Sequence, residues 1–372
     1  MGPAGTRVPR TVALFPRSGE ERSRRLVWVA LLVAPLQAPG TDGAPAREFR
    51  KAPVWQDLGE GASARFAFTA TWDPEGERVL VHAGETRKES RFAFLQDLWQ
   101  FTPRDGAWKQ LSTPVSPGGR AYHAAAYDSR RGAVWMFGGT GADLVARDDL
   151  WKLDCKSSSW SRVEWEGPGP GARFSASLVY DPKRDQLLLW GGCKAFFESD
   201  NAWPEAWSLD LESLRWTHKK SSAPARWQAA ATLSPEADLL IAQGGFDQNS
   251  SPRAETWLYD LEKDRWSEAT KGPKATEAHC AVWDPLARKA VFFGGASTGR
   301  DGLDTLWAFD PEARKKKQWS VLEPSGATPG GRAYHAGLWL PEPGALWVFG
   351  GTENAFNAPL REARAWRIPL HE

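Results

Sequence analysis

The stretch Ala133–Gly139, AVWMFGG, is an apolar run typical of a buried β-strand, and it ends in two glycines. The same arrangement returns about every fifty residues, with a degenerate first copy, VLVHAG, at 79–84. A glycine pair lets the backbone turn sharply or come close to another segment, so we expect a strand to end at each pair. The predicted structural pairs are Gly138 and Gly139, Gly191 and Gly192, Gly244 and Gly245, Gly294 and Gly295, and Gly350 and Gly351.

Other residues recur at fixed distances from the glycines. Eighteen residues before the first glycine position, the six copies carry Arg65, Arg120, Arg173, Arg226, Thr276 and Arg332. A turn signal such as DPEGE (73–77) stands between this position and the glycines, which predicts a hairpin of two strands, a and b. Two tryptophans follow on either side of a second turn and predict strands c and d. Those of strand c are Trp99, Trp151, Trp207, Trp257, Trp307 and Trp366, and those of strand d are Trp108, Trp160, Trp216, Trp266 and Trp319.

Six short-strand units of this length predict an all-β fold, a six-bladed β-propeller with four antiparallel strands per blade. The units resemble the kelch repeat, which has an arginine near the start of strand a, Gly-Gly closing strand b, an aromatic in strand c and tryptophan in strand d. The resemblance covers residues 54 to about 370 and points to a bacterial-type, secreted kelch protein. Two copies depart from the pattern, with Ala83 at the first glycine position and Thr276 at the arginine position.

The sixth copy ends after its strand c, at AWRIPLHE (365–372). The missing strand d is predicted at the start of the propeller, where VWQDL (54–58) matches AWKQL (107–111) and supplies Trp55. This strand would complete the last blade and close the ring, which removes open sheet edges. The predicted domains are a leader at 1–38, a flexible linker at 39–53 and the propeller at 54–370.

The leader contains RSRRLVWVALLVAPLQA (22–38), in which basic residues precede a short apolar run, as in a secretory signal peptide. We therefore expect export to the periplasm or the outside, with a cytoplasmic location as the alternative. The run is too short to span a membrane comfortably. The full chain of 372 residues has a net charge of +1, which gives no general attraction to nucleic acid. Its three cysteines are too few and scattered for a disulfide framework, and we expect no metal, no cofactor and a monomer.

An acid stands two residues before most strand-c tryptophans, and it is absent in the copy that lacks the arginine. In copy order these positions hold Asp97, Asp149, Glu205, Glu255, Thr305 and Arg364. Strands a and c start at the same end of a blade, so we predict a partly buried arginine–carboxylate clamp in each blade that has both partners. Arg332 is the exception because Arg364 takes the acid position, although Glu362 is a substitute. It is therefore the arginine best placed to meet a ligand.

Three histidines, His123, His279 and His335, share one position in strand a. Copies two and five lie opposite each other in a ring of six, so we expect satisfied core histidines there and not a metal site.

Recognition is expected on the face where the b–c and d–a loops emerge, which we call the loop face; kelch propellers commonly bind partners there. The extended loops of copies one, three and six carry aromatics that predict a binding surface, together with Arg332. These aromatics are Phe92, Phe94, Phe196, Phe197, Trp203 and Phe356. We expect a non-catalytic scaffold for a protein or peptide. The alternatives are a glycan-binding propeller and an extracellular enzyme of the galactose-oxidase-like kelch group, although the tyrosine, cysteine and histidine pattern of that group is missing.

Overall fold

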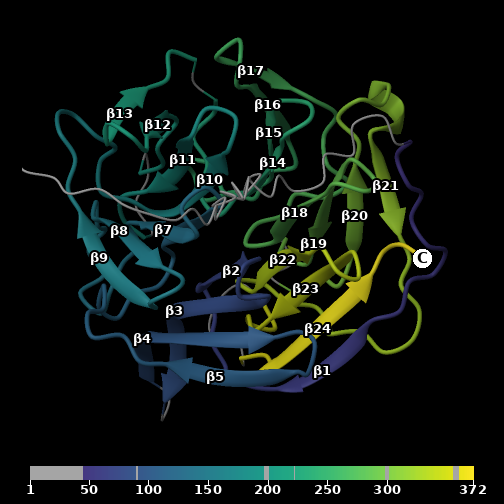
Figure 1. Ribbon diagram of the computed structural model, residues 1–372. Helices are drawn as coiled ribbons and strands as arrows, with labels where there is room; N and C mark the ends of the chain where they lie inside the picture. Colours follow the sequence, from purple (N-terminus) through teal and green to yellow (C-terminus); the bar gives the residue numbers. More distant parts are fainter. Residues whose placement is uncertain (1–44, 89–90, 197–200, 222, 298–300, 355–359) are drawn as a thin grey trace, which may run out of the picture. The chain divides into compact units, whose positions relative to one another are not determined.

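The computed structural model describes residues 45–372, except 89–90, 197–200, 222, 298–300 and 355–359 (Figure 1). The predicted leader and the first part of the predicted linker lie outside these residues. Contacts divide the chain at Asp42, and the unit described below begins after it. In the described residues, no helix is long and apolar enough to cross a membrane.

The described unit contains six four-stranded antiparallel sheets, each a blade whose strands run outward from a to d. Blade 1 comprises β2 (Thr69–Asp73), β3 (Arg78–Lys88), β4 (Arg91–Thr102) and β5 (Ala107–Leu111). Blade 2 comprises β6 (Ala124–Asp128), β7 (Ala133–Phe137), β8 (Leu150–Asp154) and β9 (Ser159–Val163). Blade 3 comprises β10 (Phe174–Asp181), β11 (Gln186–Cys193), β12 (Ala206–Asp210) and β13 (Arg215–His218). Blades 4 and 5 comprise β14 (Ala230–Ser234), β15 (Leu239–Gln243), β16 (Thr256–Asp260) and β17 (Arg265–Glu268); and β18 (Cys280–Asp284), β19 (Lys289–Phe293), β20 (Leu306–Phe309) and β21 (Trp319–Leu322). Blade 6 comprises β22 (Ala336–Leu340), β23 (Ala345–Phe349), β24 (Arg364–Pro369) and β1 (Gln56–Glu60). One 3₁₀ turn, η1 (Lys315–Lys317), lies in the c–d connection of blade 5.

The ring closes as predicted, because β1 is the outer strand of blade 6. It pairs antiparallel with β24, with Gln56 opposite Arg367 and Asp57 opposite Trp366. Trp55 is buried in the same core cluster as Trp366 and packs on Phe293 of blade 5 at 5.0 Å between ring centroids. The inner strands contact one another in the cycle β2, β6, β10, β14, β18, β22 and back to β2. The predicted six-bladed propeller is therefore confirmed.

The glycine pairs connect neighbouring blades. Gly138 and Gly139 have φ angles of 66° and 90°, a conformation that L side chains rarely adopt. The amide of Gly139 donates to the carbonyl of Arg173 in the next blade at 3.0 Å, and a Cβ at Gly138 would overlap the same carbonyl. Glycine therefore ends strand b because the next blade begins against it.

Blade faces bury their apolar side chains against each other. Between blades 2 and 3, for example, Trp135 and Phe137 share a core cluster with Leu187, Leu189 and Trp216. This packing explains the tryptophan ladders, because a large ring at the same place in each blade fills the space between neighbouring sheets.

The second half of the predicted linker packs on the propeller. The amide of Arg50 donates to the carbonyl of Leu370 at 2.8 Å, and Phe49 stacks on His371 at 5.7 Å between centroids. His371 in turn contacts the buried carboxylate of Asp284 at 2.7 Å. Residues 47–50 thus contact the propeller through the backbone and through Phe49, and composition could not show that Phe49 packs beside His371.

Candidate binding site at the loop face

The predicted clamps form where strands a and c begin. Arg65 donates two hydrogen bonds to Asp97, at 2.8 and 2.9 Å, and Arg120 binds Asp149 with the same two distances. Burial opposes ionisation of Asp97, but the hydrogen bonds and charge of Arg65 outweigh it and hold the pKa of Asp97 below its ordinary value. These arginines are consequently neutralised within the blade and are not free anion sites.

The clamp is looser in the next two blades. The closest charged atoms of Arg173 and Glu205 are 3.7 Å apart, and those of Arg226 and Glu255 are 3.3 Å apart. Trp203 covers the first of these clamps, because the guanidinium of Arg173 lies 4.7 Å from its ring centroid and the ammonium of Lys194 lies 4.2 Å from it. Trp203 therefore packs against two cations of its own blade.

Arg332 is buried, only 2% exposed, and donates to the backbone carbonyls of Gly350, Gly330 and Pro329. No carboxylate pairs with it among the described residues. Glu362 does not substitute for the acid; it pairs with Arg364, whose other partners are Asp57 and Glu60. Burial, and then the charge of Arg361, lower the pKa of Arg332 to about 9. The structure thus places Arg332 beneath the surface.

Six residues at the start of strand a surround the channel mouth at the loop face. They lie two positions after the clamp position and all have positive φ, between 52° and 58°: Ala67, Tyr122, Ser175, Gln228, Ala278 and Tyr334. Positive φ directs each of these side chains away from the course of the following strand. The rings of Tyr122 and Tyr334 meet edge to face at 5.9 Å between centroids, and the Tyr334 hydroxyl donates to Gln228 at 3.2 Å.

Aromatic rings continue from this pair onto the loops, and we call the set of Phe66, Phe92, Tyr122, Phe174, Phe196 and Tyr334 the mouth cluster. Phe66 contacts Tyr122, Tyr334 and Phe92, with centroid separations of 6.4, 6.1 and 6.3 Å. Tyr122 lies 5.3 Å from Phe196, which packs on Phe174 at 4.2 Å. The cluster therefore joins the loops of blades 1 and 3 across the mouth, and Phe92 at 49% exposure forms its accessible edge.

Two carboxyl groups border the mouth cluster, Glu85 of blade 1 and Glu277 of blade 5, and both are buried. Burial raises the pKa of Glu85 to about 7, against the smaller effect of Arg87, and raises that of Glu277 to about 8. Both carboxyls act electrostatically on the hydroxyl of Tyr122. The mouth therefore combines aromatic surface with acidic groups that are partly protonated near neutral pH.

Of the aromatics predicted from the sequence, Phe92 and Phe196 are part of the mouth cluster. Phe94 lies on the same face of the β3–β4 hairpin as Phe92, opposite Glu85, and its backbone runs against Gly119 of the next loop. Phe197 and Phe356 lie outside the described residues.

Below the mouth, the channel holds a cavity of about 130 Å³ lined partly by His123, His279 and His335. His123 has two hydrogen-bond partners, Thr69 at 2.8 Å and His82 at 3.4 Å. Burial lowers the pKa of all three, so they are neutral. They are core histidines, and the rings of His279 and His335 pack against the first glycine of the pair in the preceding blade. No cluster of histidine, cysteine and acidic residues suited to a metal ion occurs in the described part of the chain.

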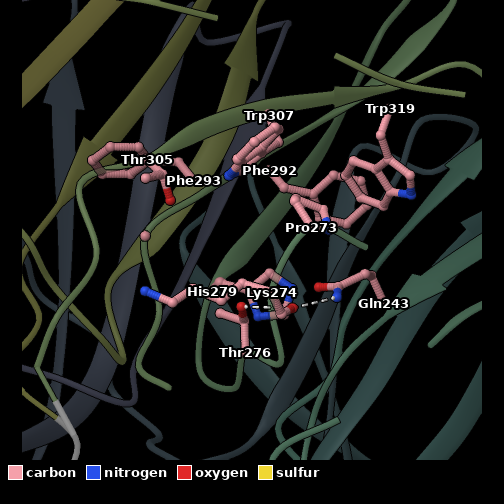
Figure 2. Close-up of a pocket in the computed structure, with 11 residues that line it drawn as sticks. Gln243, Pro273, Lys274, Thr276, His279, Phe292, Phe293, Thr305, Trp307 and Trp319 are labelled. Atoms are coloured by element: carbon pink, nitrogen blue, oxygen red, sulfur yellow. Dashed lines mark hydrogen bonds between the residues drawn. The ribbon is translucent and has the colours of Figure 1, made fainter. Parts of the chain in front are cut away.

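A smaller pocket marks the blade that lacks the clamp (Figure 2). Thr276, Lys274, His279 and Gln243 lie along one side of it, and Thr305, Trp307 and Phe292 lie along the other. Its volume is about 20 Å³, which is enough for a water molecule but not for an organic ligand. This pocket is therefore a consequence of the two threonines and a poor candidate for the binding site.

Sequence reasoning missed Tyr122, Tyr334, Glu85 and Glu277. One signal was available: the octapeptide PGGRAYHA occurs twice, at 117–124 and 329–336, and both copies place a tyrosine two residues after the clamp arginine. The two copies lie in blades 2 and 6, on either side of blade 1, so their tyrosines could have been expected to lie near each other.

Comparison with known proteins agrees with the geometry. Residues 134–363 match the Attractin/LZTR1 beta-propeller, and residues 50–217 match the KLHDC2/KLHL20/DRC7 Kelch-repeats domain. The chain is 35% identical to human Kelch domain-containing protein 3 over 159 residues, which is 41% of this chain and 36% of that protein. It is 29% identical to the flagellar outer arm dynein alpha chain of Chlamydomonas reinhardtii over 191 residues, 46% of this chain and 4% of that one. It is 28% identical to Dynein regulatory complex subunit 7 of the same alga over 118 residues, 32% of this chain and 10% of that one.

The chain thus spans about a third of the human relative and much less of the two algal proteins. The bacterial-type, secreted character stays a prediction. Because one family model matches more than half of its residues, the chain belongs to the Attractin/LZTR1 beta-propeller family, and the predicted kelch-repeat propeller is confirmed.

Proposed function

We propose that this chain is a binding scaffold that recognises a segment of a partner protein or peptide through the mouth cluster on its loop face. One observation carries the proposal: aromatic rings from several blades join into one surface whose edge, Phe92, is half exposed. Aromatic anchors surrounded by packed neighbours dominate the energetics of protein interfaces. The kelch relatives support the same role, since propellers of this kind commonly bind proteins.

A selection from a displayed library of random heptapeptides tests this function on the purified chain. We expect peptides that bind the unmodified protein and lose at least about tenfold in affinity to Phe92→Ala or Phe196→Ala, since an aromatic hot spot contributes about 2 kcal/mol or more. Val321→Ala is the matched control, because Val321 is 47% exposed against 49% for Phe92 but lies on the outer strand β21.

Peptides that lose affinity equally to the control variant would contradict the proposal. A glycan stacked on the aromatic rings is the alternative ligand. Binding to a glycan array that is lost in Phe92→Ala, with no peptide selected, would favour it.

We also propose that the chain is exported and monomeric. Basic residues before an apolar run at 22–38 support export. A single copy is supported by β1, which supplies the outer strand of blade 6, so no blade needs a strand from a second chain. Amino-terminal sequencing of protein recovered from the cell exterior tests the first point, with an uncleaved chain confined to the cytoplasm as the contradicting result. Light scattering of the purified protein tests the second.

A further inference from the structure

Glu277 is a buried acid without a cation. Its side chain is 1% exposed, and its Oε2 atom accepts no hydrogen bond from any described residue. A side-chain hydrogen bond with Tyr334 lowers its pKa, but the effect of burial is larger. Keeping a carboxyl group away from water without a paired charge is costly, and such groups concentrate at functional sites.

The rings next to Glu277 are suited to a positive charge. Phe66, Tyr122 and Tyr334 pack edge to face around the mouth, and aromatic faces attract ammonium and guanidinium groups. The cluster already holds one cation of its own chain, because the guanidinium of Arg87 lies 5.1 Å from the ring centroid of Phe92.

Nearby arginines do not neutralise this acidity. Arg65 and Arg120 are paired with Asp97 and Asp149 in their own blades. The charge of Arg87 lowers the pKa of Glu85, and no described cation affects the pKa of Glu277. The hydroxyl of Tyr122 is affected by Glu85, Glu277 and the buried thiol of Cys193, so the mouth between these groups carries excess negative character when the carboxyls ionise.

We propose that the mouth cluster accepts a lysine ammonium or arginine guanidinium of the partner, held over Tyr122 and beside the carboxyls of Glu85 and Glu277. This inference rests on the proposed function, because it names the side chain that the loop face recognises. An anionic ligand would be repelled by the two carboxyls when they are ionised, and an uncharged one would leave Glu277 buried without a paired charge. A cation satisfies Oε2 of Glu277 and uses the ring faces at the same time.

The test uses single amino-acid derivatives as probes of the full chain. N-acetyl-lysine N-methylamide and N-acetyl-arginine N-methylamide are titrated by calorimetry, with the uncharged N-acetyl-norleucine N-methylamide as the matched ligand. We expect at least one cationic probe to bind about tenfold more tightly than norleucine, and Glu277→Gln to reduce that ratio to about threefold or less. Glu236→Gln, an exposed acid in the β14–β15 turn at the opposite end of its blade, is the control that should leave the ratio unchanged.

Proton linkage gives a second readout. A bound cation favours the ionised carboxyl, so binding should release protons near neutral pH and tighten from pH 6 to pH 8.5, less so in Glu277→Gln. Equal affinity for norleucine, no binding of either cationic probe, or an unchanged ratio in Glu277→Gln would each overturn the inference. The peptide selection separates the two proposals. Selected peptides that need Phe92 for binding but share no lysine or arginine would support the proposed binding function and contradict the cation site.

Discussion

The backbone amide of Ala67 in blade 1 donates a hydrogen bond of 2.9 Å to the carbonyl oxygen of Tyr334 in blade 6. The equivalent residue of each blade makes the same bond to the blade before it, at 2.7 to 3.1 Å, so the bonds form a closed cycle around the channel mouth. Every residue in the cycle has positive φ, although none of them is glycine. The cycle that joins the blades is thus the feature that brings Tyr122 and Tyr334 together.

Replacing a residue of this cycle by glycine should lower the free energy of unfolding less than the same replacement in a strand. Positive φ costs an ordinary L-residue about 1–2 kcal/mol, whereas glycine loses about 0.5–1 kcal/mol through the entropy of the unfolded chain. We expect Ala278→Gly to be neutral or to raise the free energy of unfolding by up to about 1 kcal/mol. Ala126→Gly in β6, with 7% exposure against 8% for Ala278, should lower it by about 1 kcal/mol.

Urea denaturation of both variants measures the difference. An equal loss of stability in the two proteins would show that the left-handed backbone at Ala278 carries no strain.

Ring closure by β1 should decide whether the propeller folds. Deleting residues 54–60 removes Trp55 from its core cluster and leaves β24 as an open edge. We expect most of the cooperative thermal transition followed by circular dichroism to disappear. Deleting residues 1–44 is the control and should leave the midpoint nearly unchanged. Similar melting of the two truncated chains would contradict the closure.

Breaking one clamp should destabilise the protein strongly. Asp149→Asn removes the charge that pairs with Arg120, whose side chain is 2% exposed. Removing one partner of a buried ion pair costs about 3–5 kcal/mol, and we expect about 2–3 kcal/mol here because the Asp149 side chain is 16% exposed. Asp148→Asn changes the exposed neighbour and should alter the free energy of unfolding by less than about 0.5 kcal/mol. An equal change in the free energy of unfolding for Asp148→Asn and Asp149→Asn would show that the clamp does not stabilise the protein.

Glu277 should make the protein less stable as the pH rises. Burial raises its pKa from 4.5 to about 8, so between these values the folded protein keeps a proton that the unfolded chain has released. The free energy of unfolding should therefore fall with pH across this interval, by up to about 1.4 kcal/mol per unit from this group. Glu277→Gln has no such proton, so its stability relative to the unmodified protein should increase from pH 5 to pH 8.

Urea titrations at several pH values test this sign. Parallel stability curves for the two proteins would mean that Glu277 ionises in the folded state as it does in the unfolded chain.

The sequence predicted the blades because their determinants have a fixed register. The glycine pairs, the two tryptophan ladders and the arginine–acid pairs all lie in or beside strands, where one repeat constrains the next. Tyr122 and Tyr334 were missed for a physical reason. Positive φ is usually marked by glycine or asparagine, and here alanine, tyrosine, serine and glutamine adopt it, so residue type alone did not indicate the backbone conformation at these positions. The packing of Phe49 on His371 could not be predicted, because a single phenylalanine in a segment rich in alanine and proline carries no periodic pattern.

A clamp could be introduced into blade 5, where Thr276 and Thr305 stand at the positions that hold an arginine and an acid in blades 1 to 4. In four other blades the arginine donates to the carbonyl of the first glycine position, as Arg120 does to Gly138 at 3.0 Å. Thr276→Arg alone should lower the free energy of unfolding, because it places a cation without a carboxylate beside a pocket of only about 20 Å³. Thr305→Asp alone should also lower it, because burial opposes an unpaired carboxylate.

The double variant should recover much of both losses. A new pair with the geometry of Arg65 and Asp97 would give a favourable coupling energy of about 1–3 kcal/mol in a double-mutant cycle measured by urea denaturation. The corresponding pair Thr276→Lys and Thr305→Asp should couple more weakly, because an ammonium cannot make the two parallel bonds of a guanidinium. If the effects of Thr276→Arg and Thr305→Asp are additive, the two side chains do not pair. The backbone of blade 5 would then differ from that of the blades that have a clamp.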